Sequence, residues 1–235
     1  MNAGRLKIGV VGAGPVGTVL GKALAAAGHQ LIGITTTDTK NIERAEAMLT
    51  DVPVLSVDEV VQGADFVLFA IPANEISSTV SGLAKAGIFR AGQLIAHTAG
   101  EFGIGVLEPA TAQGVIPLAL HPAMSFTGTS IDLSRIRESF FAVAAPAVAL
   151  PIAQALVIEM GAEPVVISEE EREIYYEAIS VANNFSKLIV SQSIGLLESV
   201  GVENPRAVLG PLLRSAVEEA LADGHTPINP EELLN

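Results

Sequence analysis

The chain has 235 residues, of which 49% are hydrophobic and only 4% aromatic, and it carries a formal net charge of −13. This acidity excludes the clustered basic side chains that a phosphate backbone demands, so we expect no nucleic acid partner. The absence of cysteine excludes disulfides, a thiol nucleophile and a cysteine-based metal site. The length allows one large domain or two modest ones, with a small-aliphatic core that suits parallel strands buried on both faces.

An apolar run at 6–11 leads directly into a glycine-rich motif, Gly12-Ala13-Gly14-Pro15-Val16-Gly17, and helix-compatible residues follow it. Gly12 permits a tight turn, Gly14 lets the backbone approach a pyrophosphate, and Gly17 lets the helix pack closely on the strand. The pyrophosphate would lie at the helix N-terminus, where free N–H groups favour an anion. The motif, with Pro15 and Val16 included, therefore predicts a dinucleotide site. The alternative is a glycine turn in an α/β domain that binds no nucleotide.

The end of the next predicted strand, at 29–35, bears on the choice between NAD and NADP. An acidic residue about twenty residues after the last glycine binds the ribose hydroxyls of NAD, and a basic residue accepts the phosphate of NADP. This chain has Thr36, Thr37, Asp38 and Lys40 in that region. The threonine hydroxyls and Lys40 favour NADP, whereas Asp38 favours NAD. We expect NADP, with NAD as the alternative.

Strands and helices alternate over the following part of the chain. We expect strands at 52–55, 65–71, 93–97, 115–121 and 139–144, and helices at 42–49, 57–62, 74–86 and 147–160. This alternation predicts a parallel, doubly wound sheet. The segment 140–160 is apolar enough to suggest a membrane span, but Pro146, Pro151 and Glu159 interrupt it, so we expect a strand, a turn and a helix.

A helix-favouring region begins near Ser168, with a run of three glutamates at its start. We expect one helix over 175–200 and another over 204–222. The sequence therefore predicts an α/β fold in which a Rossmann-type NAD(P)-binding domain at 1–167 precedes a small all-helical domain at 168–235. The helical domain would bind substrate or form a dimer.

Ligands of open parallel sheets bind outside the carboxyl ends of the strands, so three predicted strand ends are candidate parts of a site. Ile71 and Pro72 end one strand and are expected to line the ribose and nicotinamide. His97, followed by Thr98, and His121 end two others. A histidine there can protonate a carbonyl or imine as hydride arrives, because its pKa lies near neutrality. The alternative for each histidine is a structural role in which it satisfies loop carbonyls.

In the helical region, Tyr176, Ser180 and Asn184 share a face at helical spacing, with Asn183 and Lys187 as an alternative pair. Such a face can hold a polar substrate, with Tyr176 and Asn184 orienting it. The alternative is a helix–helix or dimer contact with polar ends. The histidines and carboxylates match no metal-binding spacing, so we expect no metal.

The glycine motif, the segments His97-Thr98-Ala99-Gly100 and His121-Pro122-Ala123-Met124-Ser125-Phe126, and Tyr176 with Asn183-Asn184 resemble the Rossmann-like proteins that carry a C-terminal domain of unknown function (type 2520). That group is distantly similar to the 6-phosphogluconate dehydrogenase, pyrroline-5-carboxylate reductase and ketopantoate reductase superfamily. The resemblance covers nearly the whole chain. It implies an NAD(P)-binding fold with a helical domain that often dimerises. The catalytic lysine of the 6-phosphogluconate-type enzymes is replaced by Ser180, counting back from Asn184.

We therefore expect a cytoplasmic NAD(P)-dependent oxidoreductase that reduces a small, acidic carbonyl or imine substrate and forms a homodimer through its helical domain, without a membrane partner. His97 or His121 would protonate the substrate, and Tyr176 and Asn184 would orient it. The candidates for a basic anchor are Arg135, Arg137, Lys187 and Arg214. The alternative is a non-catalytic NAD(P) sensor or assembly protein, because fold alone does not prove chemistry.

Overall fold

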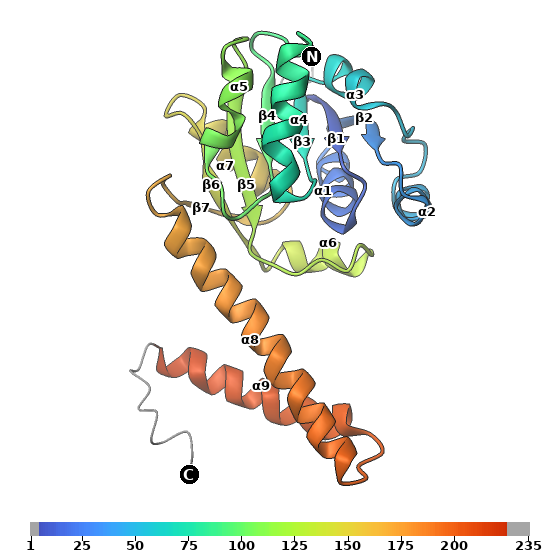
Figure 1. The fold of residues 1–235 in the computed structure, drawn as a ribbon, viewed down its shortest axis with the longest axis vertical. Helices are drawn as coiled ribbons and strands as arrows, with labels where there is room; N and C mark the ends of the chain where they lie inside the picture. The colour runs from blue at the N-terminus through green and yellow to red at the C-terminus, as the bar shows by residue number, and fades with distance from the viewer. Residues whose placement is uncertain (1–4, 225–235) are drawn as a thin grey trace. The chain divides into compact units, whose positions relative to one another are not determined.

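The computed structural model describes residues 5–224, which divide between two compact units, 1–177 and 178–235 (Figure 1). The first unit contains the whole β-sheet and the start of a long helix, α8 (Arg172–Ser199). The boundary expected from the sequence lies just before this helix, between the domains 1–167 and 168–235. That boundary stays a prediction.

The first unit is built on a seven-stranded sheet in the order β2-β1-β3-β4-β5-β6-β7. Its strands are β1 (Lys7–Val11), β2 (Gln30–Thr35), β3 (Phe66–Phe69), β4 (Leu94–His97), β5 (Ile116–Pro122), β6 (Phe140–Ala144) and β7 (Glu163–Val166). The strands β1 to β5 pair in parallel, so their carboxyl ends share one edge. The strand order reverses between β1 and β3, and this switch point is where open α/β sheets bind ligands.

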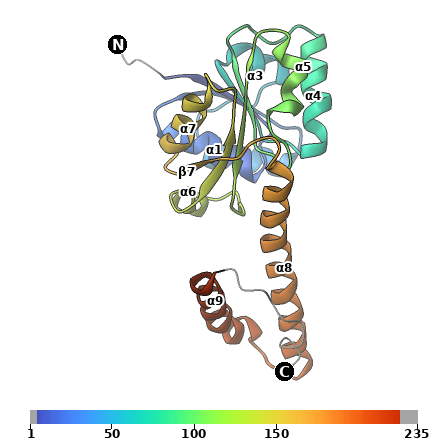
Figure 2. The same cartoon turned by 90° about the vertical axis from the view of Figure 1, so that its left-hand side faces the viewer.

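Helices cover both faces of the sheet, as the alternation of elements predicts (Figure 2). They are α1 (Pro15–Ala26), α2 (Thr39–Met48), α3 (Val57–Gly63), α4 (Ala73–Lys85), the short 3₁₀ helix η1 (Ile104–Leu107), α5 (Glu108–Thr111), α6 (Ile131–Ile136) and α7 (Leu150–Glu159). One core packs α1 and α7 against the sheet, around Leu20 and Leu156. A second core packs α3 and α4 on the other face, around Val60 and Ile76. The doubly wound Rossmann-type fold is therefore confirmed.

Two details of the expected sheet are wrong. Strand β6 runs antiparallel to β5, because α6 in the connection between them is only six residues long and does not carry the chain back across the sheet. The strand expected at 52–55 is reduced to a single bridge between Ile34 and Val54. Pro53 contributes to this, since proline has no N–H for a sheet ladder.

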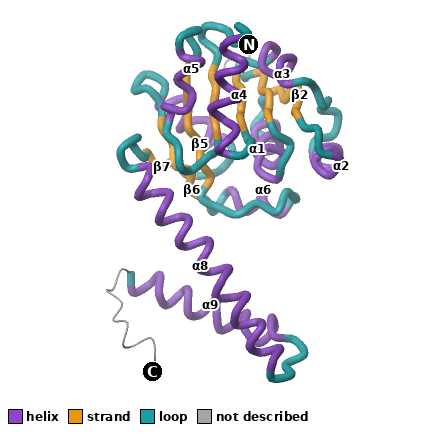
Figure 3. The backbone as a smooth tube through the Cα atoms, viewed as in Figure 1, coloured by secondary structure: helices purple, strands orange, loops and turns teal. Residues whose placement is uncertain are grey.

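The second unit is helical, as predicted (Figure 3). It contains most of α8 and then α9 (Pro205–Asp223). Asn204 caps the start of α9, because its side chain accepts a hydrogen bond from the N–H of Ala207. The apolar segment 140–160 forms β6 and α7, as expected. Among the described residues, no helix has the length and apolar character needed to cross a membrane.

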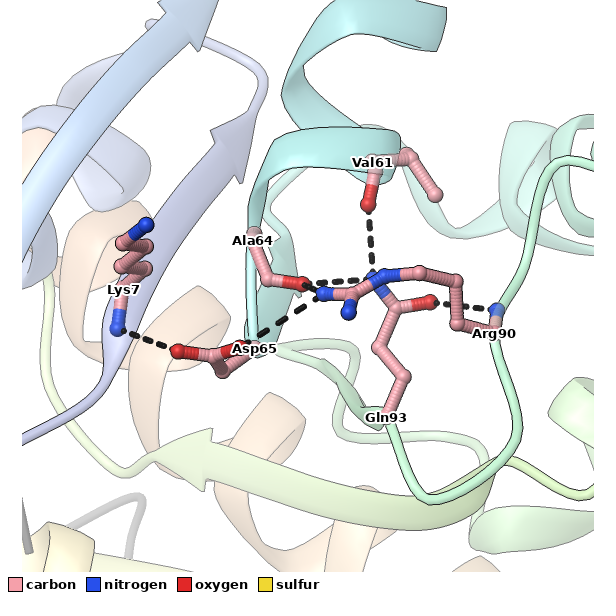
Figure 4. Close-up of polar contacts among 6 residues, drawn as sticks. All are labelled: Lys7, Val61, Ala64, Asp65, Arg90 and Gln93. Atoms are coloured by element: carbon pink, nitrogen blue, oxygen red, sulfur yellow. Dashed lines mark hydrogen bonds and ion pairs between the residues drawn. The ribbon is translucent and has the colours of Figure 1, made fainter.

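Side chains at the amino ends of the strands hold α3 against the sheet (Figure 4). Gln93, which is 3% exposed, donates from Nε2 to the carbonyl oxygens of Val61 at 2.6 Å and Ala64 at 2.8 Å. Arg90 donates to the same Ala64 carbonyl at 2.6 Å and pairs with Asp65 at 3.5 Å. These contacts satisfy carbonyls at the end of α3, at the edge of the sheet opposite the glycine motif.

Replacing Gln93 with Leu should lower the free energy of unfolding by about 1–3 kcal/mol, because two backbone carbonyls lose a buried donor. Gln62→Leu is a matched control, since Gln62 is exposed on α3, and it should change stability by less than about 0.5 kcal/mol. Denaturant unfolding measures both variants. Equal effects of the two substitutions would contradict the role assigned to Gln93.

Candidate functional site

The glycine motif forms the turn between β1 and α1, and each glycine has the environment that its predicted role requires. Gly12 has a φ of +107°, and a Cβ there would lie 2.4 Å from the carbonyl oxygen of Ala70. A Cβ on Gly17 would lie 1.9 Å from the carbonyl oxygen of Gly12. A Cβ on Gly14 would meet nothing within 4 Å. The turn is therefore tight and closely packed on one side and open at Gly14.

The start of α1 is suited to an anion. The helix begins at Pro15, directly before Val16, and its N-cap residue Gly14 forms no side-chain capping bond. The first N–H groups of such a helix have no partner within the helix and carry part of the positive end of the helix dipole. The N–H of Gly12 donates to Thr35 Oγ1 at 3.1 Å, which fixes the loop to the end of β2. The open side of Gly14 thus lies at a helix N-terminus that can receive a pyrophosphate.

A cavity of about 380 Å³ lies beside this loop, at the carboxyl ends of β1 and β2. Four predicted cofactor-binding residues line it: Gly12, Thr36, Thr37 and Ile71. The lining also includes polar residues that were not predicted, among them Ser56 and Glu75. Ser56 is the N-cap of α3 in a capping box with Glu59. The Ser-x-x-Glu pattern indicates such a helix start, but nothing in it indicates proximity to a nucleotide.

The remaining predicted cofactor residues lie at the same edge of the sheet. Pro72 is the N-cap residue of α4, and the N–H of Thr98 donates to the carbonyl oxygen of Phe69 at 3.2 Å, next to the end of β3. The carboxylate of Asp38 accepts hydrogen bonds from the N–H groups of Lys40 at 2.8 Å and Asn41 at 3.3 Å. Asp38 therefore caps α2, while the side chain of Lys40 is exposed on its first turn.

The contacts of His97 are those of a histidine with a structural role, in which the ring satisfies backbone groups of a loop. It is fully buried, its Nε2 lies 2.7 Å from the carbonyl oxygen of Gly103, and its Nδ1 accepts from the N–H of Ala99 at 3.2 Å. A carbonyl only accepts, so Nε2 carries the proton and the ring is neutral. The pKa of His97 is lowered to about 4, mainly by burial and in smaller part by the charge of Arg172, while the hydrogen bond to Gly103 opposes the shift. Because both ring nitrogens are occupied, we do not retain His97 as a catalytic candidate.

Protonation of the buried histidines makes stability depend on pH. The pKa of His97 in the folded protein is about 4, and burial likewise lowers the pKa of His121 to about 4, whereas an unfolded histidine has a pKa of about 6.5. Between these values the unfolded chain binds protons that the folded chain does not. The contribution of each histidine is therefore complete above pH about 6.5 and is lost as the pH falls toward 4.

We expect each histidine to lower the free energy of unfolding by up to about 1.4 kcal/mol per pH unit as the pH falls through this window. His97→Gln, which keeps a side-chain donor, should remove one of the two contributions. Denaturant unfolding at several pH values measures the slope. A His97→Gln variant with the wild-type slope would contradict the buried, neutral state of this residue.

His121 differs from His97, although both follow the same sequence pattern. Its Nδ1 lies 2.7 Å from Tyr175 Oη, and the two rings meet edge to face at 82°. On the other side of the ring, a Cβ added to Gly100 would lie 2.8 Å from His121 Nε2 and 2.9 Å from Tyr176 Cδ2. The structure therefore brings two predicted residues, His121 and Tyr176, together over Gly100. The sequence analysis missed Tyr175, since its spacing resembles that of any helical tyrosine.

Arg172 lies against this pair and was also missed. It is 2% exposed, and its guanidinium lies 5.9 Å from the centre of the Tyr175 ring. Burial lowers the pKa of Arg172, and Arg172 in turn lowers the pKa of His121. The residue follows three glutamates in the sequence, a context that is typical of an exposed helix start rather than a buried charge.

The predicted substrate face of α8 extends beyond the first unit. Tyr176 belongs to the first unit, while Ser180 and Asn184 belong to the second, and Asn183 Nδ2 donates to Asn184 Oδ1 at 3.3 Å. The three residues of this face lie on one continuous helix, so their i, i+4 spacing on α8 is as expected. The roles of Tyr176 and Asn184 toward a substrate stay predictions.

Two family models match the chain, a Rossmann-like domain at residues 1–122 and a domain of unknown function (DUF2520) at residues 139–228. The chain belongs to the Rossmann-like family that carries this C-terminal domain. The resemblance inferred from the sequence motifs is thereby confirmed. No curated protein matches the chain at a significant level.

Solved structures share the fold at low sequence identity. A candidate NADP oxidoreductase from Bacteroides fragilis superposes with a TM-score of 0.77 at 18% identity, over 92% of this chain and 80% of that one. A pyrroline carboxylate reductase from Plasmodium falciparum with NADP bound gives 0.68 at 16% identity, over 95% and 82%. A 3-hydroxyisobutyrate dehydrogenase from Mycobacterium tuberculosis gives 0.62 at 16% identity, over 84% and 67%. At these identities the likeness shows the fold alone.

Proposed function

We propose that the protein is an NAD(P)-dependent oxidoreductase that reduces a small carbonyl or imine compound. The observation that carries this proposal is the open side of Gly14 at the start of α1, next to the cavity at the switch point of the sheet. A bound nicotinamide dinucleotide supplies the hydride, and the protein supplies orientation and exclusion of water. The fold shared with a candidate NADP oxidoreductase and with an NADP-bound pyrroline carboxylate reductase supports the same class.

In the proposed dinucleotide site, different residues bind the pyrophosphate and the ribose. The backbone of the glycine motif and the start of α1 would hold the pyrophosphate, and the hydroxyls of Thr36, Thr37 and Ser56 would surround the ribose next to the adenine. We favour NADP over NAD, because the Asp38 carboxylate already accepts two backbone N–H bonds and Lys40 is exposed on the same turn. A ribose phosphate gains from Lys40, whereas a free ribose gains little from an occupied carboxylate.

The proposed proton donor is His121. Burial raises the pKa of Tyr175, so the phenol keeps its proton and can donate it in a hydrogen bond to His121 Nδ1. This bond leaves the proton of the neutral imidazole on Nε2, the nitrogen next to Gly100 and Tyr176. Nε2 would then give its proton to the oxygen or nitrogen anion that develops as hydride arrives, while Nδ1 takes the phenol proton of Tyr175. The ring stays neutral in this exchange, and the phenolate that remains lies beside the charge of Arg172. Tyr176, which belongs to the same unit as His121, would orient the substrate.

We also propose that a second copy of this chain covers the helical unit. Large apolar side chains are exposed on α8 and α9: Phe185, Leu188, Leu196, Leu212, Val217 and Leu221. Monomeric soluble proteins rarely expose this much apolar surface, and helices gain most of their stability by packing such a face. Sedimentation velocity would report a dimer; a monomer at all concentrations would contradict this part of the proposal.

The experiment that tests the function is a turnover screen with NADPH and NADH against 2-oxo acids, cyclic imines and semialdehydes, followed by loss of reduced-nicotinamide absorbance. We expect turnover of at least one acidic carbonyl or imine, faster with NADPH. Binding of the dinucleotide without turnover of any compound would instead favour the sensor or assembly protein.

A further inference from the structure

Arg172 is a buried positive charge that forms no ion pair with another described residue. Its Nε and Nη1 have no hydrogen-bond partner there, and its Nη2 reaches only the carbonyl oxygen of Ala142, at 3.5 Å. A guanidinium keeps its proton under all ordinary conditions, so its donors cannot be removed by deprotonation. A buried charge without a partner is costly, and proteins rarely retain one without a use.

The acidic residue that acts on this charge, Glu169, is already engaged elsewhere. The carboxylate of Glu169 accepts hydrogen bonds from the N–H of Ile104 at 2.9 Å and from the N–H of Gly105 at 3.4 Å. It acts on Arg172 through its charge, but no ion pair joins the two side chains. Glu169 therefore fixes the turn before α8 to η1 and leaves the donors of Arg172 unsatisfied.

The other groups around Arg172 are neutral. His121 and Tyr175 bond to each other, and His97 bonds to the backbone. The cluster thus holds one positive charge, no negative charge that pairs with it, and free donors on two nitrogens. The cluster includes His121, which we propose as the proton donor.

We propose that Arg172 is the receptor for a carboxylate group of the substrate. This inference rests on the proposed function and names the substrate class, which is a 2-oxo or imino acid. Guanidinium and carboxylate form strong charge-assisted hydrogen bonds, and one positive charge matches one carboxylate. The charge of Glu169 opposes a dianion such as phosphate at the same place.

The position of Arg172 also links substrate binding to the proton donor. Arg172 is one of the causes that hold the pKa of His121 low. A carboxylate bound to Arg172 would cancel this charge, so the imidazole would become easier to protonate only when substrate is present. The residues before Arg172, at 169–171, form an exposed turn, whereas the side chain of Arg172 itself is covered.

Thermal unfolding in the absence of nucleotide tests the receptor, with pyruvate as the probe and pyruvamide as its neutral counterpart at equal ionic strength. At about ten times its Kd, pyruvate should raise the Tm of the wild-type protein by about 3–5 °C, and pyruvamide should not. Arg172→Met should show no pyruvate shift and should match or exceed the wild-type Tm without ligand, because an uncompensated charge is removed. Arg137→Met, at an exposed position, should keep the full shift.

Nitrogen NMR of the wild-type imidazoles supplies a second readout that does not depend on a folded variant. Pyruvate should raise the pKa of His121, and pyruvamide should not. No pyruvate effect on Tm and no shift of His121, or an equal Tm shift with phosphate, would overturn the carboxylate receptor. Because neither readout uses NADPH, a carboxylate effect in a protein that binds no dinucleotide would leave the receptor intact and reject the proposed oxidoreductase.

Discussion

Replacing Gly14 with Ala is expected to weaken NADPH binding at least tenfold while leaving the Tm within about 1 °C of the wild-type value. A Cβ on Gly14 meets no protein atom within 4 Å, so the fold accepts the methyl group. The same methyl group fills the space through which the backbone approaches the pyrophosphate. Loss of this approach costs the ligand its hydrogen bonds to the start of α1.

Gly82→Ala is the matched control for this substitution. A Cβ on Gly82, in α4, also meets nothing within 4 Å, so this variant should fold and bind NADPH as the wild-type protein does. Fluorescence titration gives the two affinities and thermal unfolding gives the two Tm values. If Gly14→Ala binds NADPH as tightly as Gly82→Ala, the pyrophosphate does not lie on the glycine motif.

Replacing His121 with Gln is expected to lower kcat by about 10²–10⁴-fold on any substrate that the turnover screen identifies, with NADPH affinity unchanged. Gln can fill much of the same space and donate a hydrogen bond, but it cannot transfer a proton. Tyr175→Phe should also lower kcat, because Nδ1 then has no phenol proton to take up when Nε2 gives up its own. His97→Gln serves as the comparison, since both ring nitrogens of His97 bond to the backbone.

These variants separate the two histidines by their effect on catalysis rather than on folding. The account requires a much larger loss of kcat in His121→Gln than in His97→Gln, measured at equal fractions of folded protein. A larger loss in His97→Gln would reverse the assignment of the proton donor.

The sequence predicted the features that depend on local pattern. The apolar run, three glycines and a helix-compatible segment identify a dinucleotide fold, because adjacent backbone atoms require Gly12 and Gly17, and Gly14 leaves the start of α1 open. The direction of β6 was not predictable, since an apolar strand has the same pattern whichever way it runs.

The candidate site was predictable only in part, because its chemistry depends on contacts between distant segments. His97 and His121 both end apolar strands, and only the carbonyl of Gly103 and the hydroxyl of Tyr175 distinguish them. The four basic residues considered as an anchor did not include Arg172. Arg172 is buried because it packs beside Ala142, which lies in a strand thirty residues earlier in the chain. A local sequence pattern does not show such a contact.

Whether this chain binds a nicotinamide dinucleotide can be measured by a fluorescence titration of the cofactor-stripped protein with NADPH and NADH. Reduced nicotinamide reports its own binding, and the absence of tryptophan from the chain keeps the signal clear. The account predicts saturable, micromolar binding, tighter for NADPH than for NADH. No binding of either nucleotide to folded protein would contradict it.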